Sequence, residues 1–238
     1  MRLDAQHSFS ERYPLPTLAS ILKRNRFEGT ILTAPQATRP SELAGLPEFV
    51  RGVVIRADRM DPRMLDEYQR EARFRGLSLG PTDGLPEYLE ELERRNLTLD
   101  LRDKLGCIPG IADRLPSLRM AIVHLGSPVV GNDGAWDRWA SALEAAAHAP
   151  QVCCKLSGLT GLRESPWRAE DLRPYVEHAL AVFGPGRLMF GSGWPANLPE
   201  HTWKESLAAF TQSIGARPME VREELLGGTA ARFYGIVP

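Results

Sequence analysis

The stretch from residue 120 to residue 158 reads MAIVHLGSPVVGNDGAWDRWASALEAAAHAPQVCCKLSG and combines two apolar runs with one helical pattern. The runs "MAIVHLG" (120–126) and "VCCKLSG" (152–158) are short and end at glycine, which predicts two buried strands. Between them, "AWDRWASALEAAAHA" (135–149) carries apolar residues at helical spacing. A strand, a helix and a second strand in this order indicate a repeated β/α unit.

The same alternation extends over the whole chain of 238 residues. The other six apolar runs cover residues 2–6, 29–34, 51–57, 75–80, 97–102 and 187–193. Helical patterns cover residues 15–25, 61–73, 85–96, 172–184, 202–214 and 219–234. Eight strands with about as many helices predict an α/β fold, a single-domain (β/α)8 TIM barrel over residues 1–238. An open doubly wound sheet is the alternative, but "DAQHSFS" (4–10) lacks the glycine-rich phosphate turn that usually follows its first strand.

Composition and charge exclude several functional classes. The formal net charge is -1 and no basic run occurs, which argues against nucleic acid or an anionic membrane surface as a partner. No apolar run reaches the roughly 18 residues of a membrane span, and the N-terminus lacks the apolar core of a signal peptide. Three cysteines make a poor disulfide framework, so we expect a cytoplasmic protein. With nucleic acid and membrane disfavoured, we expect a small-molecule ligand. A homo-oligomer is left open.

Polar residues that close the apolar runs are the candidate site residues, because TIM barrels place their chemistry at the C-terminal ends of the strands. His124 is the strongest candidate, since it follows four apolar residues and precedes a turn, so its ring should lie near the barrel mouth. Lys155 follows "VCC", where an ammonium is unfavourable unless it is paired or reaches the mouth. The remaining polar strand ends are Gln6, His7, Ser8, Arg56, Ser78, Asp100, Arg102, Ser157 and Ser192.

Each strand-end residue has a purely structural alternative, as a helix cap or a loop hydrogen bond. That alternative is as good as the functional one for Arg56, Asp100 and Ser157, and we prefer it for Ser78 and Ser192. Side chains alternate along a strand, so His7 should face away from Gln6 and Ser8, which flank it.

Four motifs carry a resemblance to a known family. They are "PSLRMAIVHLGSP" (116–128), "VCCKLSGL" (152–159), "FGPGRLMFGSGWP" (183–195) and "LLGGTAARFYGI" (225–236). Together they resemble the amidohydrolase-related family, in its branch of sugar lactonases and pyrone-dicarboxylate lactonases. The resemblance spans nearly the whole chain and implies a (β/α)8 barrel. In many relatives a divalent metal is bound at the strand ends, whereas some lactonase relatives work without one.

The chain departs from the metal-binding pattern of that family. The family usually carries Asp-x-His-x-His on its first strand and Gly-Ser-Asp-Trp-Pro on its eighth; here "LDAQHS" puts Gln6 and Ser8 at the histidine positions, and "GSGWP" puts Gly193 at the aspartate. In the family this aspartate accepts a proton from the attacking water. Ser78 stands where lactonase relatives often carry an arginine. Of the family's four central groups only His124 remains, so we expect no metal and no other cofactor.

Three functional hypotheses follow. The first is a metal-independent enzyme for a small lactone or other cyclic or carboxylated carbonyl compound, with His124 as general acid or base and Lys155 and Asp100 as further catalytic residues. The reaction is hydrolysis, or an isomerisation, dehydration, decarboxylation or cyclisation. The second is an inactive barrel kept for binding a ligand or partner, and the third a metal held by His7 with Asp4 or Asp100. For the first hypothesis the expected substrate-binding residues are Arg56, Arg102, Gln6, Ser8, Ser157 and Trp194.

Overall fold

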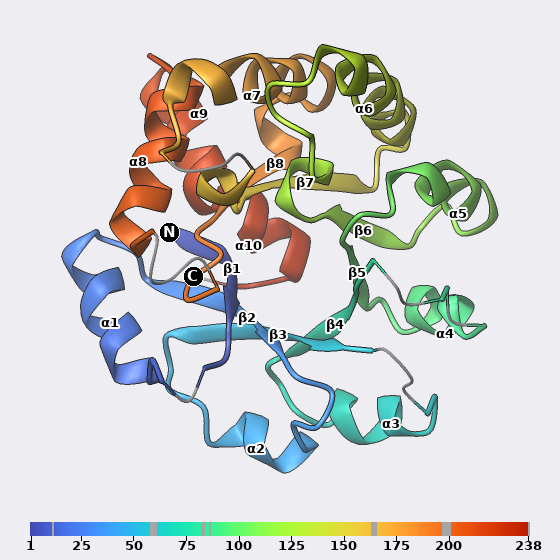
Figure 1. Ribbon diagram of the computed structural model, residues 1–238. Coiled ribbons are helices and arrows are strands. Elements are labelled where there is room, and N and C mark those ends of the chain that lie inside the picture. Colours follow the sequence, from blue (N-terminus) through green and yellow to red (C-terminus); the bar gives the residue numbers. More distant parts are fainter. Residues whose placement is uncertain are drawn as a thin grey trace.

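Eight parallel strands form a nearly closed barrel in the computed structural model, which describes residues 1–10, 12–57, 61–81, 84–85, 87–162, 166–196 and 201–237 (Figure 1). The strands are β1 (Leu3–Ser8), β2 (Gly29–Ala34), β3 (Val50–Arg56), β4 (Phe74–Leu79), β5 (Thr98–Leu101), β6 (Arg119–Ile122), β7 (Val152–Ser157) and β8 (Leu188–Gly191). They follow one another around the sheet in sequence order. The predicted fold class and all eight predicted strands are therefore confirmed.

Helices surround this barrel, and the last of them, at Thr229–Tyr234, packs against its interior residues (Figure 1). They are α1 (Leu15–Arg24), α2 (Pro40–Ala44), α3 (Met64–Gln69), α4 (Leu89–Arg94), α5 (Ile108–Arg114), α6 (Asp133–Ala147), α7 (Ala169–Phe183), α8 (Trp203–Ile214), α9 (Met219–Glu223) and α10 (Thr229–Tyr234). The helices predicted over residues 61–73 and 85–96 shrink to six residues each. Within the described residues, none of these helices is long and apolar enough to cross a lipid bilayer.

The helix predicted over residues 219–234 is interrupted by a π-helical turn at residues 224–228. The interruption brings the backbone of Gly227 against the start of β1, where an added Cβ atom would lie 2.4 Å from the carbonyl oxygen of Met1. Only glycine permits so close an approach of two backbones. The bend places α10 against one end of the barrel, and in the view of Figure 1 it lies inside the outline of the strands.

The barrel interior is therefore apolar at the end where α10 lies. Ala230, Phe233 and Tyr234 of α10 pack against inward-facing residues of the strands. Those strand residues are Leu3, Ala5, Ile31, Val54, Ala121, Cys153 and Met189. Since this apolar cluster fills the lower interior, the polar interior residues gather towards the C-terminal ends of the strands.

The seam between β1 and β8 has few ladder hydrogen bonds among the described residues. Ser8 N–H donates to the Trp194 carbonyl oxygen, and Gly193 N–H donates to the Gln6 carbonyl oxygen, each over 2.8 Å. The buried Asp4 carboxyl group supplies two further bonds, because it accepts from Ser192 N–H and from Trp203 Nε1–H, each also over 2.8 Å. Burial raises the pKa of Asp4, and these hydrogen bonds oppose the shift. Asp4 thus closes the ring through its side chain.

His7 has a structural environment, as expected from its position on the far side of β1 from the cavity. Its ring is fully buried, and Nδ1 lies 2.7 Å from Thr30 Oγ1 and 3.2 Å from the Ile31 carbonyl oxygen. Nε2 is buried without a hydrogen-bond partner among the described residues. Burial lowers the pKa of His7 to about 3, so the folded protein holds this imidazole neutral.

Acid should therefore destabilise the protein through His7. Its pKa falls from about 6.5 unfolded to about 3 folded, so stability is complete above pH 6.5 and is lost as the pH falls toward 3. At about 1.4 kcal/mol per unit, His7 should remove about 2–3 kcal/mol of unfolding free energy between pH 7.5 and 4.5. Urea unfolding of wild type and His7→Asn at both pH values measures this, with the exposed His148→Asn as the matched control. An equal pH dependence in wild type and His7→Asn contradicts the prediction.

Candidate active site

A polar cavity of about 230 Å³ opens at the C-terminal ends of the strands. Its lining includes five residues predicted from the sequence: Gln6, Ser8, Arg56, Arg102 and His124. The other lining residues are Thr33, Ser78, Leu79, Gly80, Pro81, Val123, Gly193 and Ala196. Ligand pockets are commonly about 300–1,000 Å³. This cavity is somewhat smaller, so it suits a ligand at the small end of that range.

The charge of the described cavity lining is positive. Arg56 is the last residue of β3 and is exposed, whereas Arg102 follows β5 and is half-buried. No Asp or Glu is among the lining residues within the part of the chain that the structure describes. Two guanidinium groups without a facing carboxylate favour an anionic ligand, which arginine can bind through two parallel hydrogen bonds.

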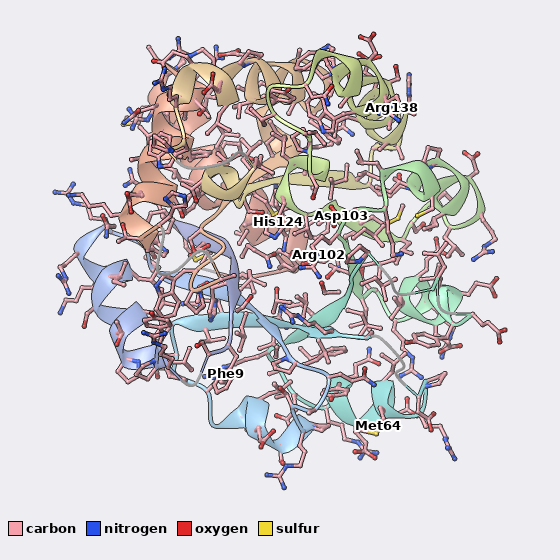
Figure 2. All side chains as sticks on the ribbon, viewed as in Figure 1. Phe9, Met64, Arg102, Asp103, His124 and Arg138 are labelled. Atoms are coloured by element: carbon pink, nitrogen blue, oxygen red, sulfur yellow. The ribbon has the colours of Figure 1, made fainter. Side chains whose placement is uncertain are left out.

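A second, more open cavity of about 400 Å³ adjoins the first. Arg102 and His124 line both cavities, and the second also contacts Asp103, Pro128 and Leu162. Figure 2 shows Arg102, Asp103 and His124 close to the centre of the barrel, at the ends of β5 and β6. These residues therefore stand at the junction of a narrow polar cavity and a wider one.

His124 lies at the barrel mouth, as its place in the sequence predicts. It lies two residues after the end of β6 and has a backbone φ of 53°, in a region that costs a non-glycine residue about 1–3 kcal/mol. The ring packs against Gly158, where an added Cβ atom would lie 2.6 Å from Nδ1. Burial, and after it the positive charges of Arg102 and Lys155, lower the pKa of His124 to about 4. The imidazole is therefore neutral near pH 7.

Ser157 determines which nitrogen of His124 carries the proton. The Ser157 Oγ atom lies 3.0 Å from Nδ1 and accepts the backbone N–H of His124 over 3.2 Å. The hydroxyl proton then needs an acceptor, and Nδ1 is its only partner in the described structure. This arrangement leaves the proton of the neutral ring on Nε2, which has no hydrogen-bond partner among the described residues.

Lys155 and Asp100 form a buried ion pair beneath the cavity. Lys155 Nζ lies 2.5 Å from Asp100 Oδ2 and 2.8 Å from Gln6 Oε1, and both charged side chains have no solvent exposure. The Tyr234 hydroxyl group of α10 donates to Asp100 Oδ1 over 2.8 Å. Burial lowers the pKa of Lys155, the nearby Asp100 carboxylate opposes this, and burial raises the pKa of Tyr234 well above 10. Of the two alternatives that the sequence left open for Lys155, pairing or the barrel mouth, the structure has the first, because these partners hold the ammonium group below the cavity.

The remaining predicted residues divide between structural and site positions. Ser157 is buried under the His124 ring. Trp194 is also buried; the centre of its ring lies 6.0 Å from that of Tyr13, and it is not among the described residues that line the cavity. Ser192 has the structural role that we preferred, since its hydroxyl group bonds Gln6 O and Trp194 N. Ser78 was assigned to the same role, yet it lines the cavity.

Two site residues escaped the sequence analysis. Thr33 lines the cavity and accepts a hydrogen bond from Gln6 Nε2 over 3.0 Å. It is polar and near the end of the run "GTILTA", the signal that identified the other residues. Tyr234 gave no such signal, because it belongs to a helical pattern far from every strand end.

The donor groups at the strand ends do not fit a divalent metal. Gln6 and Ser8 offer an amide and a hydroxyl group, and Gly193 offers no side chain, whereas zinc and its relatives prefer imidazole, thiolate or carboxylate ligands. The Lys155 ammonium, a cation, is already bound to Gln6. The alternative ligands His7, Asp4 and Asp100 are engaged with protein partners, and no group of three or more His, Cys, Asp or Glu residues within the described ranges could hold a metal.

Comparison with known proteins places the chain among related sequences and structures. A family model described as amidohydrolase matches residues 36–236. The protein y4mH of Sinorhizobium fredii is 32% identical over 212 residues, 79% of this chain and 71% of that protein. An L-fucono-1,5-lactonase of Burkholderia multivorans is 39% identical over 129 residues, 49% of this chain and 43% of the lactonase.

A solved structure of an amidohydrolase from Burkholderia multivorans, with bound zinc, superposes with a TM-score of 0.83 at 26% identity. A second structure of such an amidohydrolase, with bound HEPES, superposes with the same score at 25% identity. In both cases the match covers 100% of each chain.

Proposed function

The chain belongs to the amidohydrolase family, and from this premise we propose that it is a metal-independent enzyme for a small, carboxylated lactone or a related carbonyl compound. His124 acts as the general acid or base, and Arg56 and Arg102 bind the substrate carboxylate. The observation that carries the proposal is the composition of the cavity: one neutral imidazole and two guanidinium groups around a space of about 230 Å³. The lactonase relatives supply the substrate class.

The state of His124 restricts its chemistry. A neutral ring with the proton on Nε2 donates a hydrogen bond to a carbonyl or ring oxygen, which stabilises the negative charge that develops there. The opposite tautomer, which forms only if the Ser157 hydroxyl group turns its proton away from Nδ1, accepts a proton at Nε2 from a substrate carbon or from water. Both require the uncharged imidazole, and a pKa of about 4 supplies this form at neutral pH.

Hydrolysis and non-hydrolytic steps both remain within this proposal. The family's eighth-strand aspartate, which accepts the proton of the attacking water, is Gly193 here, so hydrolysis needs another base. Isomerisation, dehydration, decarboxylation or cyclisation needs no activated water. The positive cavity suits those of these reactions in which negative charge develops on a substrate carbonyl oxygen.

A lactone panel tests the proposal. L-fucono-1,5-lactone, 2-pyrone-4,6-dicarboxylate and other cyclic or enolisable acids are incubated with the purified protein, and products are followed by NMR and proton release. We expect turnover of a carboxylated compound, unchanged by a chelator or by added zinc, because the strand ends lack a suitable ligand set. Elemental analysis of the same preparation should find no stoichiometric transition metal.

Two results would redirect the assignment. Activity that rises with zinc and falls with a chelator contradicts the metal-independent mechanism. Tight binding of a panel compound without turnover supports a binding barrel instead, as the loss of the family's groups on both β1 and β8 would allow.

A further inference from the structure

The side-chain amide of Gln6 is held in one orientation by two buried partners. Its oxygen, Oε1, lies 2.8 Å from Lys155 Nζ, and its nitrogen, Nε2, donates to Thr33 Oγ1 over 3.0 Å. An ammonium group has donors and no acceptor, so the amide atom facing Lys155 must be the oxygen. The nitrogen carries two protons, and the bond to Thr33 uses one. Among the described residues the second proton has no partner, and because Gln6 and Thr33 both line the cavity, it is available to a ligand.

The Lys155 side chain is itself fixed from the opposite side. Asp100 accepts from Lys155 over 2.5 Å and from the Tyr234 hydroxyl group over 2.8 Å. Lys155 Nζ also lies 5.3 Å from the centre of the Tyr234 ring, and all three side chains are essentially fully buried. The chain of contacts therefore runs without a break from α10 through the barrel interior to the cavity floor.

A buried positive charge at the amide oxygen draws electron density away from Nε2–H and strengthens it as a donor. Hydrogen bonds polarise one another along such a chain, and the effect is larger where water is excluded. Gln6 also stands where the family pattern has the first histidine of β1, so an ammonium ion lies beside a position at which relatives hold a metal ligand. In this protein the cation is the Lys155 ammonium group, and its charge acts through the side-chain amide of Gln6.

We propose that Gln6 Nε2–H binds the carbonyl oxygen of the substrate, and that the Lys155 ammonium holds and polarises this amide as a positioning residue. The proposal rests on the function proposed above. The described lining of the cavity contains no Asp or Glu that would compete for this N–H donor. The donor therefore faces the place where negative charge develops on the substrate oxygen. Such preorganised donors contribute a large share of the rate enhancement in enzymes that catalyse acyl transfer.

Spectra of the side-chain amide test the locked orientation without any turnover. In ¹⁵N-labelled protein, the Gln6 signal is assigned by its loss in Gln6→Glu. We expect both Nε2 protons of Gln6 to exchange slowly with solvent in the wild type and to resonate away from those of the exposed Gln69, and both differences to shrink in Lys155→Met/Asp100→Asn. This double variant removes both charges together, so no unpaired buried carboxylate prevents folding. Nε2 protons of Gln6 that exchange with solvent as fast as those of Gln69 in the wild type overturn the proposal.

Kinetics test the donor role on whichever panel lactone the wild type converts. Gln6→Glu keeps the size of the side chain but removes the N–H donor, and kcat should fall about 10²–10³-fold with a much smaller change in KM. The same change at a surface position, Gln69→Glu, should leave kcat unchanged. A Gln6→Glu enzyme with wild-type kcat and a normal melting temperature overturns the proposal.

A titration separates this inference from the proposed function. If the wild type converts no lactone, the proposed function fails, and the Gln6 amide signal is followed while 2-pyrone-4,6-dicarboxylate is added. A shift of one Nε2 proton that saturates with the ligand supports the donor role. Binding that shifts the signals of Arg102 and His124 but not that of Gln6 overturns it.

Discussion

His124→Ala should lower kcat/KM for the converted substrate by about 10²–10⁴-fold, the range that a general acid or base contributes. The loss should fall mainly on kcat, because the neutral imidazole acts on charge that develops in the transition state. The arginines that bind the carboxylate remain in the variant, so KM should change little. Steady-state kinetics at pH 7.5 measure the effect, and a rate within threefold of wild type would falsify the role of His124.

Ser157→Ala is the matched variant for the same site. It removes the hydroxyl group that sets the tautomer of His124 but keeps the imidazole. We expect a smaller loss of kcat than in His124→Ala, together with a changed acid limb of the pH–rate profile. In the wild type this limb should lie near pH 4, because activity requires the uncharged ring and falls as the ring is protonated. A limb near pH 6.5 contradicts the buried environment of His124.

Lys155→Met should lower the free energy of unfolding by about 3–5 kcal/mol, the usual result of removing one partner of a buried ion pair. Among the residues that the structure describes, the substitution leaves the buried Asp100 carboxylate with the Tyr234 hydroxyl group as its one partner. It also removes the donor to Gln6 Oε1. Chemical denaturation measures the loss, with Lys204→Met as the control for an exposed lysine.

The double variant Lys155→Met/Asp100→Asn should recover much of that stability, since neither residue then carries a buried charge. Asparagine still accepts from Tyr234. A double variant as unstable as Lys155→Met would show that packing, and not the unpaired carboxylate, determines the loss. The two results together measure the coupling between Lys155 and Asp100.

Much of the site follows from strand ends alone. His124, Gln6 and Ser8 line the cavity because a parallel barrel brings the C-terminal ends of its strands together, and side-chain alternation turns His7 away. The same reasoning gave the number and order of the strands. It overestimated the length of short helices such as α3 and α4, because the apolar spacing there extends over only a few residues between loops.

The environment of Lys155 could not be predicted from its own strand. Its partners Gln6 and Asp100 are 149 and 55 residues away, and Tyr234 comes from a helix that packs against the end of the barrel only because Gly227 allows the bend. A lysine at a strand end can reach outward to solvent or be paired inside. To choose between these two positions, one must know how deeply the neighbouring side chains are buried in the barrel, and this depends on packing in three dimensions.

The seam between β1 and β8 has a consequence for how the protein folds. The bond from Ser192 N–H to Asp4 joins groups 188 residues apart, so closing the ring carries a larger loss of chain entropy than pairing neighbouring strands. Contacts of such long separation form slowly, and we expect the strands to pair in sequence order before the seam forms. Gln6 and Gly193 face each other across that seam. During refolding, activity should therefore return after strand structure, with the closing of the ring.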